Sequence, residues 1–221
     1  MSNSQTSPVN ILCFGDSNTW GLNSPAGQRF DYNSRWPRIL SNILGDAATV
    51  YENGVCGRTT VFEDPISPGR CGLSSLEDAL RVNEPLDLLI LNLGTNDTKS
   101  YFQASSPIIA SGLELLVRTA QNPSTYTFGV AVSKILIISP IILSDDVEEK
   151  NPLFGYNATS IQSSKDLASH YKRIADLYGC LFLDSSKLVS PCDFDGIHMD
   201  ASGHRVLAEE IAKIIKKEFS I

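Results

Sequence analysis

The chain of 221 residues is long enough to bury one sizeable core, so we expect a single domain over residues 10–221 behind a flexible segment at residues 1–9. Its 18 basic and 25 acidic residues give a formal net charge of −7, which argues against a nucleic-acid backbone or an anionic membrane as the main partner. No apolar run approaches the length of a membrane span, and the polar opening residues do not resemble a secretory signal.

The five cysteines are scattered along the chain, an odd count without a C-x-x-C pair. This pattern fits neither a disulfide framework nor a zinc ribbon, and it favours a reducing, cytoplasmic compartment. We expect most of them to be buried apolar residues, with Cys56 as a candidate exception near the predicted crevice.

Short apolar runs alternate with helical patterns, which is typical of βαβ units around a parallel sheet. The runs at residues 88–91 and 135–138 are continuously apolar, as expected of strands covered on both faces. The sequence therefore predicts an α/β fold with a five-stranded parallel sheet. In chain order, the predicted strands are residues 10–14, 48–51, 86–92, 134–139 and 180–184. Three helices are predicted: one begins at Pro107, one covers residues 161–178, and the last presents Leu207, Ile211, Ile214 and Ile215 on one apolar face.

Two segments, residues 121–133 and 143–160, are too irregular for a helix or a strand. The second contains an acidic cluster followed by Pro152 and Gly155. Loops of this length usually cover a site, contact a partner or are mobile, and the sequence leaves all three open.

Polar motifs follow three of the predicted strands. Gly15-Asp16-Ser17 follows the first, Gly94-Thr95-Asn96-Asp97 the third, and Asp195-Gly196-Ile197-His198 the fifth. Each motif alone is explained by a local turn or by the start of a helix. Because the carboxyl ends of parallel strands meet at one edge of a sheet, their joint presence predicts a site there.

These motifs supply the groups of a serine esterase. Ser17 is the candidate nucleophile and His198 the candidate base, because a hydroxyl needs a base to take its proton. Asp195 would hold the imidazole tautomer, with Asp193 as the second-ranked alternative. The negative oxygen that forms on the substrate needs donors, for which the candidates are the backbone amides of Ser17 and Gly57 and the side-chain amide of Asn96. Gly57 could equally be a turn residue.

Polar and aromatic residues next to Ser17 in the sequence are candidate substrate contacts. We expect Asp16, Asn18 and Trp20 to contact substrate, although core packing explains Trp20 and Trp36 as well. The two remaining histidines, His170 and His204, lie in helical patterns and are expected at the surface or the edge of the core. No metal or cofactor is expected.

The four motif positions Ser17, Gly57, Asn96 and His198 resemble, in order, the signature of the SGNH hydrolases, also called GDSL-type esterases. The stretches at residues 11–21 and 93–99 are similar to the small bacterial arylesterase and acyltransferase branch. The resemblance implies a flavodoxin-like three-layer α/β/α fold, metal-free hydrolysis of short-chain acyl or aryl esters, and often a homo-oligomer whose subunits narrow the substrate channel. Asn18 replaces the family's leucine, which leaves the polarity of the acyl pocket open.

The predicted partner is thus a small-molecule ester, hydrolysed or transferred through an acyl-enzyme. Alternatives in the same family are a carbohydrate O-deacetylase and a lysophospholipase or thioesterase. A flavodoxin-like module that only binds a nucleotide or phosphate is disfavoured, because the first loop lacks a G-x-G-x-x-G motif and a Walker lysine, and Asp16 would repel the phosphate. An α/β-hydrolase is disfavoured because Thr19 occupies the last glycine position of the G-x-S-x-G elbow.

Overall fold

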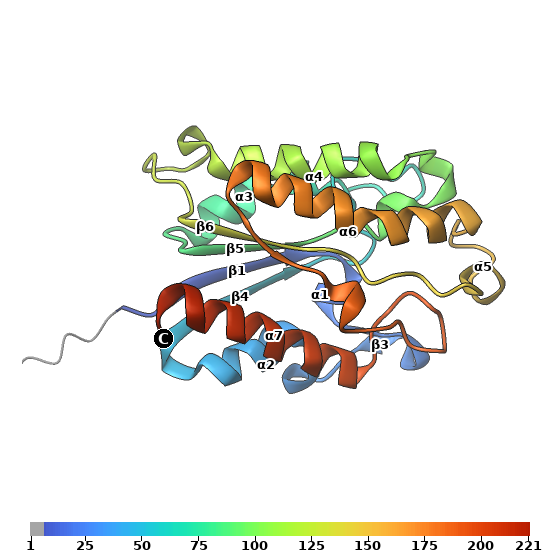
Figure 1. The fold of residues 1–221 in the computed structure, drawn as a ribbon, viewed down its shortest axis with the longest axis horizontal. Helices are drawn as coiled ribbons and strands as arrows, with labels where there is room; N and C mark the ends of the chain where they lie inside the picture. Colours follow the sequence, from blue (N-terminus) through green and yellow to red (C-terminus); the bar gives the residue numbers. More distant parts are fainter. Residues whose placement is uncertain (1–6) are drawn as a thin grey trace, which may run out of the picture.

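The computed structural model describes residues 7–221 and contains the predicted parallel sheet (Figure 1). Its five strands follow the order β4-β1-β5-β6-β7, and every neighbouring pair is parallel. The five-stranded α/β prediction is therefore confirmed, with bounds that shift by one to three residues. The strands are β1 (Val9–Gly15), β4 (Ala48–Gly54), β5 (Leu88–Asn92), β6 (Lys134–Ile138) and β7 (Leu181–Leu183).

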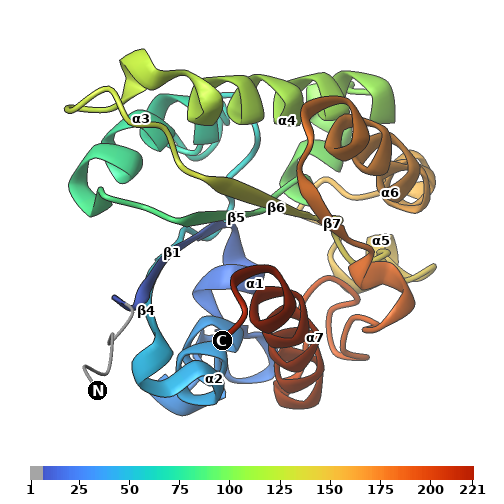
Figure 2. The same ribbon diagram turned by 60° about the vertical axis from the view of Figure 1, so that its left-hand side comes forward.

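Helices cover both faces of the sheet and give three layers (Figure 2). One face packs on α3 (Gly72–Asn83), α4 (Ser106–Gln121) and α6 (Ala158–Tyr178), and the other on α2 (Trp36–Leu44) and α7 (Ala201–Phe219). Strand alternation separates the two cores, because Leu12 and Phe14 of β1 face the first group of helices while Ile11 and Cys13 face the second.

Local signals in the sequence define the ends of the long helices. Pro107 occupies the first turn of α4, where its missing N–H costs nothing. Asn157 and Ser160 form a reciprocal capping box at the start of α6, and Gly179 ends that helix in the left-handed conformation. Asp200 caps α7 by accepting a hydrogen bond from the Gly203 N–H.

Several elements were not expected from the sequence. These are α2, α3, the one-turn helix α1 (Ser17–Trp20) and the ribbon of β2 (Leu22–Asn23) with β3 (Gln28–Arg29). The irregular segment 143–160 also contains a one-turn helix, α5 (Val147–Lys150), and the start of α6, which corrects the prediction that it forms no helix. Its acidic cluster suits a helix start, because Glu148 and Glu149 lie in the first turn.

The predicted flexible segment at residues 1–9 lies mostly outside the described residues. Val9, however, is buried and pairs with Ala48 as the first residue of β1, so ordered structure begins inside this segment. None of the helices formed by residues 7–221 combines the length and the apolar character that crossing a membrane requires.

His204 is fully buried, which corrects its predicted place at the surface or the core edge. Its Nδ1 accepts a hydrogen bond of 3.3 Å from the Trp36 N–H, and its ring stands edge-on to Phe30. Because Nδ1 is an acceptor, the ring is neutral. Burial, followed by the positive charge of a protonated His198, lowers the pKa of His204 to about 4.

This buried imidazole predicts a pH-dependent loss of stability. Between about pH 6.5 and pH 4 the unfolded chain binds a proton at His204 that the folded chain does not, so the free energy of unfolding falls as pH falls. We expect wild type to lose about 3 kcal/mol more than His204→Asn over this range, because the amide oxygen of asparagine can accept the Trp36 N–H without titrating. Urea unfolding at both pH values measures the difference, and parallel losses would contradict it.

Candidate active site

Ser17 lies where β1 ends and α1 begins. Asp16 caps α1 by accepting a hydrogen bond of 2.9 Å from the Asn18 N–H, and Gly21 closes the turn in the left-handed conformation. The tight turn places Ser17 at the first helical position, at the carboxyl edge of the sheet. This is the edge at which ligands bind in open parallel sheets, between β1 and β5, where the winding direction reverses.

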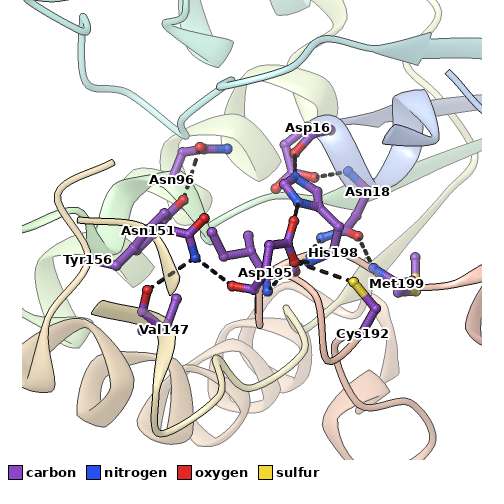
Figure 3. Close-up of polar contacts among 12 residues, drawn as sticks. Asp16, Asn18, Asn96, Val147, Asn151, Tyr156, Cys192, Asp195, His198 and Met199 are labelled. Atoms are coloured by element: carbon purple, nitrogen blue, oxygen red, sulfur yellow. Dashed lines mark hydrogen bonds and ion pairs between the residues drawn. The ribbon is translucent and has the colours of Figure 1, made fainter. Parts of the chain in front are cut away.

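A chain of hydrogen bonds joins the three residues Ser17, His198 and Asp195. Figure 3 shows the side chains of His198 and Asp195 pointing toward each other. His198 Nε2 lies 2.8 Å from Ser17 Oγ, and His198 Nδ1 lies 2.6 Å from Asp195 Oδ2. All three residues are at least nine-tenths buried. The sequence ranked Asp195 above Asp193, and the structure places Asp195 against the imidazole while Asp193 is exposed.

The Asp195 carboxylate is held as an anion. Its Oδ1 accepts hydrogen bonds from the N–H groups of Ile197 (2.8 Å) and His198 (3.0 Å). Burial alone would raise the pKa of Asp195, but the hydrogen bond from His198 and the imidazole charge hold it well below its usual range. A carboxylate that stays ionised can orient the imidazole and stabilise its protonated form.

The loop that carries His198 is tied to α1 and to segment 143–160. The Asn18 amide donates to the Ile197 carbonyl (3.3 Å). It also accepts from the Met199 N–H (3.0 Å), and the Asn151 amide donates to the Asp195 carbonyl (2.5 Å) (Figure 3). Asn18 therefore bonds to the backbone on both sides of His198. It does not line the cleft beside Ser17, where we expected it to contact substrate.

The three predicted oxyanion donors lie around the same cleft. Ser17, Gly57 and Asn96 all line it. Gly57 has a φ of +81°, a conformation that favours glycine, so the residue serves both as a turn and as cleft wall. Asn96 Nδ2 donates to the Arg58 carbonyl (3.1 Å) and its Oδ1 accepts from the Tyr156 hydroxyl (3.4 Å), which orients the amide.

Arg58 fixes the backbone beneath these donors. Its guanidinium donates to the carbonyls of Gly15 (2.9 Å) and Asn53 (2.5 Å) and to the Asn53 side chain (2.9 Å), and it stacks on the Phe14 ring at 4.0 Å. Burial lowers the pKa of Arg58 to about 10, so the group stays charged at neutral pH. The ends of β1 and β4 are thereby connected through one buried cation.

Two buried carboxyl groups lie beside the candidate site but do not line the cleft. Burial raises the pKa of both Asp16 and Asp97 to about 6. Asp97 Oδ1 accepts hydrogen bonds from the Thr60 N–H (2.8 Å) and hydroxyl (2.5 Å), which ties the loop after β5 to the segment that carries Gly57. Asp16 was expected to contact substrate, whereas the structure shows it capping α1.

The two tryptophans have different surroundings. Trp36, the first residue of α2, is fully buried in the core that α2 shares with α7 and the sheet, as the alternative of core packing predicts. Trp20 does not line the cleft; its ring lies 5.1 Å from the Arg29 guanidinium, and its carbonyl accepts a hydrogen bond from Arg29.

The cleft has a volume of about 280 Å³ and contains residues that the sequence did not single out. Phe154 and Tyr156 come from segment 143–160, one of the loops expected to cover a site, contact a partner or move. Arg70, Lys99 and Asp64 add charged groups, and Cys56 lies on the wall as its position suggested. Among residues 7–221 no three His, Cys, Asp or Glu side chains are grouped to hold a metal ion.

A serine hydroxyl bonded to an imidazole and a buried carboxylate, at the open edge of a parallel sheet, is the arrangement of a serine hydrolase. The sequence profile of the GDSL-like lipase/acylhydrolase family matches residues 13–206. The chain belongs to this family, and the prediction of a GDSL-type ester hydrolase is confirmed. No curated protein matches the sequence.

Three of the solved structures similar to this chain are described as esterases. A carbohydrate acetylesterase family member from Sinorhizobium meliloti is 29% identical, covering 96% of this chain and 100% of its own, with a TM-score of 0.88. An aryl esterase from M. smegmatis is 32% identical, covering 95% and 99%, with a TM-score of 0.86. Est24, a carbohydrate acetylesterase from Sinorhizobium meliloti, is 32% identical with the same coverage and TM-score. These likenesses also agree with the three-layer fold.

Proposed function

We propose that the protein hydrolyses short-chain acyl or aryl esters through an acyl-enzyme formed on Ser17. The observation that carries the proposal is the hydrogen-bonded chain from Ser17 Oγ through His198 to Asp195, because it supplies a nucleophile, a base and an orienting carboxylate in one cleft. The arylesterase and acetylesterase structures similar to this chain support ester chemistry at this site.

In the proposed reaction, Ser17 Oγ attacks the ester carbonyl carbon while His198 Nε2 takes the hydroxyl proton. Asp195 holds the Nδ1 proton and stabilises the imidazolium. When the tetrahedral intermediate collapses, His198 gives its proton to the leaving alcohol and the acyl group stays on Ser17. Water, or another alcohol in acyl transfer, then attacks the acyl-enzyme with His198 again as the base, and Ser17 is regenerated.

Asn96→Ala is expected to lower kcat by about 10²–10³-fold with a smaller change in KM, because one donor to the transition-state oxygen is lost. The amide is oriented by Arg58 and Tyr156 before substrate arrives, so no reorganisation is needed during the reaction. Steady-state kinetics with p-nitrophenyl acetate measure both constants. A defect confined to KM would contradict the oxyanion role of Asn96.

A panel of p-nitrophenyl esters graded from acetate to long acyl chains tests the proposed function. We expect turnover to be highest for the short chains, because the cleft volume of about 280 Å³ holds a small ester. A lack of turnover across the panel, together with no release of acetate from aryl acetates, would reject the proposal. Maximal rates with long chains would favour a lysophospholipase or thioesterase.

A carbohydrate O-deacetylase is the second candidate, because two of the similar structures are described as carbohydrate acetylesterases. Acetate release from acetylated sugars, measured beside p-nitrophenyl acetate, separates the two candidates.

We also propose, from the family resemblance, that acyl transfer and homo-oligomer formation accompany hydrolysis. The scattered free cysteines support a cytoplasmic location, and residues 10–221 are proposed as one domain.

A further inference from the structure

We propose that the cleft beside Ser17 selects esters that carry a carboxylate, and that Arg70 is the residue that binds this group. The inference rests on the proposed function, since it names a substrate class for the same site. Arg70 has no part in the bond-making steps of the proposed reaction.

Arg70 lies against the wall of the oxyanion donors. A side chain built on Gly57 would come within 3.3 Å of Arg70 Cδ and Nε, so the stem of Arg70 packs on Gly57 at the cleft surface. The backbone is fixed there, because the Arg70 carbonyl accepts a hydrogen bond of 3.0 Å from the Thr59 N–H. A group that binds Arg70 therefore sits next to the reacting ester.

The guanidinium of Arg70 has no ion-pair or hydrogen-bond partner among residues 7–221. It is absent from every salt bridge and side-chain hydrogen bond in that part of the chain, although the protein carries a net charge of −7. Arg58, by contrast, uses its guanidinium on two neighbouring carbonyls and a side chain. An arginine stays charged at any physiological pH and presents several donors to a carboxylate, so Arg70 is an unused anion-binding group.

The other charged residues of the cleft leave this positive charge uncompensated. Asp64 is buried, and its carboxylate accepts hydrogen bonds from the N–H groups of Ile66 (2.8 Å) and Ser67 (3.1 Å) and from the Tyr101 hydroxyl (2.9 Å). Lys99 Nζ lies 3.7 Å from the same carboxylate, so these two charges offset each other.

The positive charges of Lys99 and Arg70 also repel each other. Burial lowers the pKa of Lys99, the carboxylates of Asp64 and Asp97 raise it, and the Arg70 charge lowers it again. Of the three lining residues, Asp64 is the one carboxylate and is already paired with Lys99, while Arg70 and Lys99 are both cationic. A substrate carboxylate would relieve their repulsion and pair with Arg70, whereas a cationic substrate would add to it.

The test compares esters that differ by one charge. One pair places the carboxylate on the acyl group and compares p-nitrophenyl hemisuccinate with the neutral diester methyl p-nitrophenyl succinate. The other places it on the alcohol, 4-acetoxybenzoate against methyl 4-acetoxybenzoate. The quantity measured is the ratio of kcat/KM for the charged and the neutral member in wild type, Arg70→Gln and Arg70→Lys. Comparing each ratio between enzymes cancels the intrinsic reactivity of the ester.

We expect Arg70→Gln to lower this ratio about tenfold in at least one pair, since a partly exposed charged hydrogen bond is worth about one factor of ten. Arg70→Lys should lower the ratio less, because lysine keeps the positive charge. High salt should lower the wild-type ratio. Arg118→Gln is the matched control, because Arg118 is exposed near the end of α4. That helix connects parallel strands β5 and β6, so its C-terminal end lies at the opposite edge of the sheet.

Equal ratios in wild type and Arg70→Gln for both pairs would overturn the inference while leaving the esterase proposal intact. Failure to hydrolyse any member of either pair would reject the proposed function and the inference together. If Arg70→Gln does not fold, the salt series decides: a wild-type ratio that falls with salt supports the assignment, and a flat ratio overturns it.

Discussion

Replacing Ser17 with alanine is expected to lower kcat for p-nitrophenyl acetate by about 10⁵–10⁶-fold, the scale of loss seen when a hydrolase nucleophile is removed. The reason is that no other hydroxyl is bonded to His198 among residues 7–221, so the acyl-enzyme cannot form. What residual rate remains would come from the oxyanion donors and from substrate binding.

The substitution should leave the fold intact, because it removes one oxygen from the first turn of α1 and no backbone contact. The Gly21 N–H still donates to the residue 17 carbonyl, and the Asp16 cap is unchanged. Ser169→Ala is the matched control, since Ser169 is exposed on α6 and bonds only to its own helix. A Ser17→Ala protein that folds and keeps its turnover would remove the assignment of the nucleophile.

Asp195→Asn is expected to lower kcat by about 10⁴-fold, while Asp193→Asn changes it by less than about twofold. The side-chain oxygen of the introduced asparagine can keep the hydrogen bonds from the N–H groups of Ile197 and His198, so the loop retains its shape. The new amide group then faces His198 Nδ1 and donates to it. The imidazole is forced to carry its proton on Nε2, where it cannot accept the proton of Ser17.

Kinetics of the two variants side by side measure this difference, with thermal unfolding to check that both proteins fold. Asp193 is exposed and makes no ion pair among the described residues, so its replacement serves as the control. Similar losses in Asp193→Asn and Asp195→Asn would mean that the orienting carboxylate was chosen wrongly.

The residues brought together at the carboxyl edge of the sheet could be predicted because the strands are recognisable from their composition. Leu88–Asn92 and Lys134–Ile138 are apolar over most of their length, and buried parallel strands place whatever follows them at one edge. Ser17, Asn96 and His198 could therefore be assigned to one site without knowing the strand order. The prediction needed only the direction of the strands.

Residues that reach the site across long sequence separations could not be predicted in this way. Asn18 bonds to the backbone on both sides of His198, 179 and 181 positions away, and nothing in its local sequence distinguishes it from a substrate contact. Asn151 and Arg70 lie in segments with weak periodicity, so their side-chain directions depend on how the loops pack. Helix α2 is different: Trp36, Ile39, Leu40 and Leu44 are apolar at helical spacing, so this element was predictable but missed.

The buried polar residues show why the site is rigid before substrate binds. Arg58 joins the ends of β1 and β4, and Asp97 joins the loop after β5 to Thr60. Each buried donor or acceptor in these contacts would be costly to leave unpaired, so the network resists rearrangement. Preorganised donors stabilise a transition state without the cost of moving during the reaction.

Locating the covalent adduct formed with a p-nitrophenyl alkylphosphonate, which reacts only with a nucleophile activated for acyl transfer, identifies the nucleophile itself. We predict one phosphonyl group per chain, found by mass spectrometry on the peptide that contains Ser17, and strongly slowed labelling in His198→Ala. Full inactivation with the adduct on another residue, or with Ser17 unmodified, would contradict this prediction.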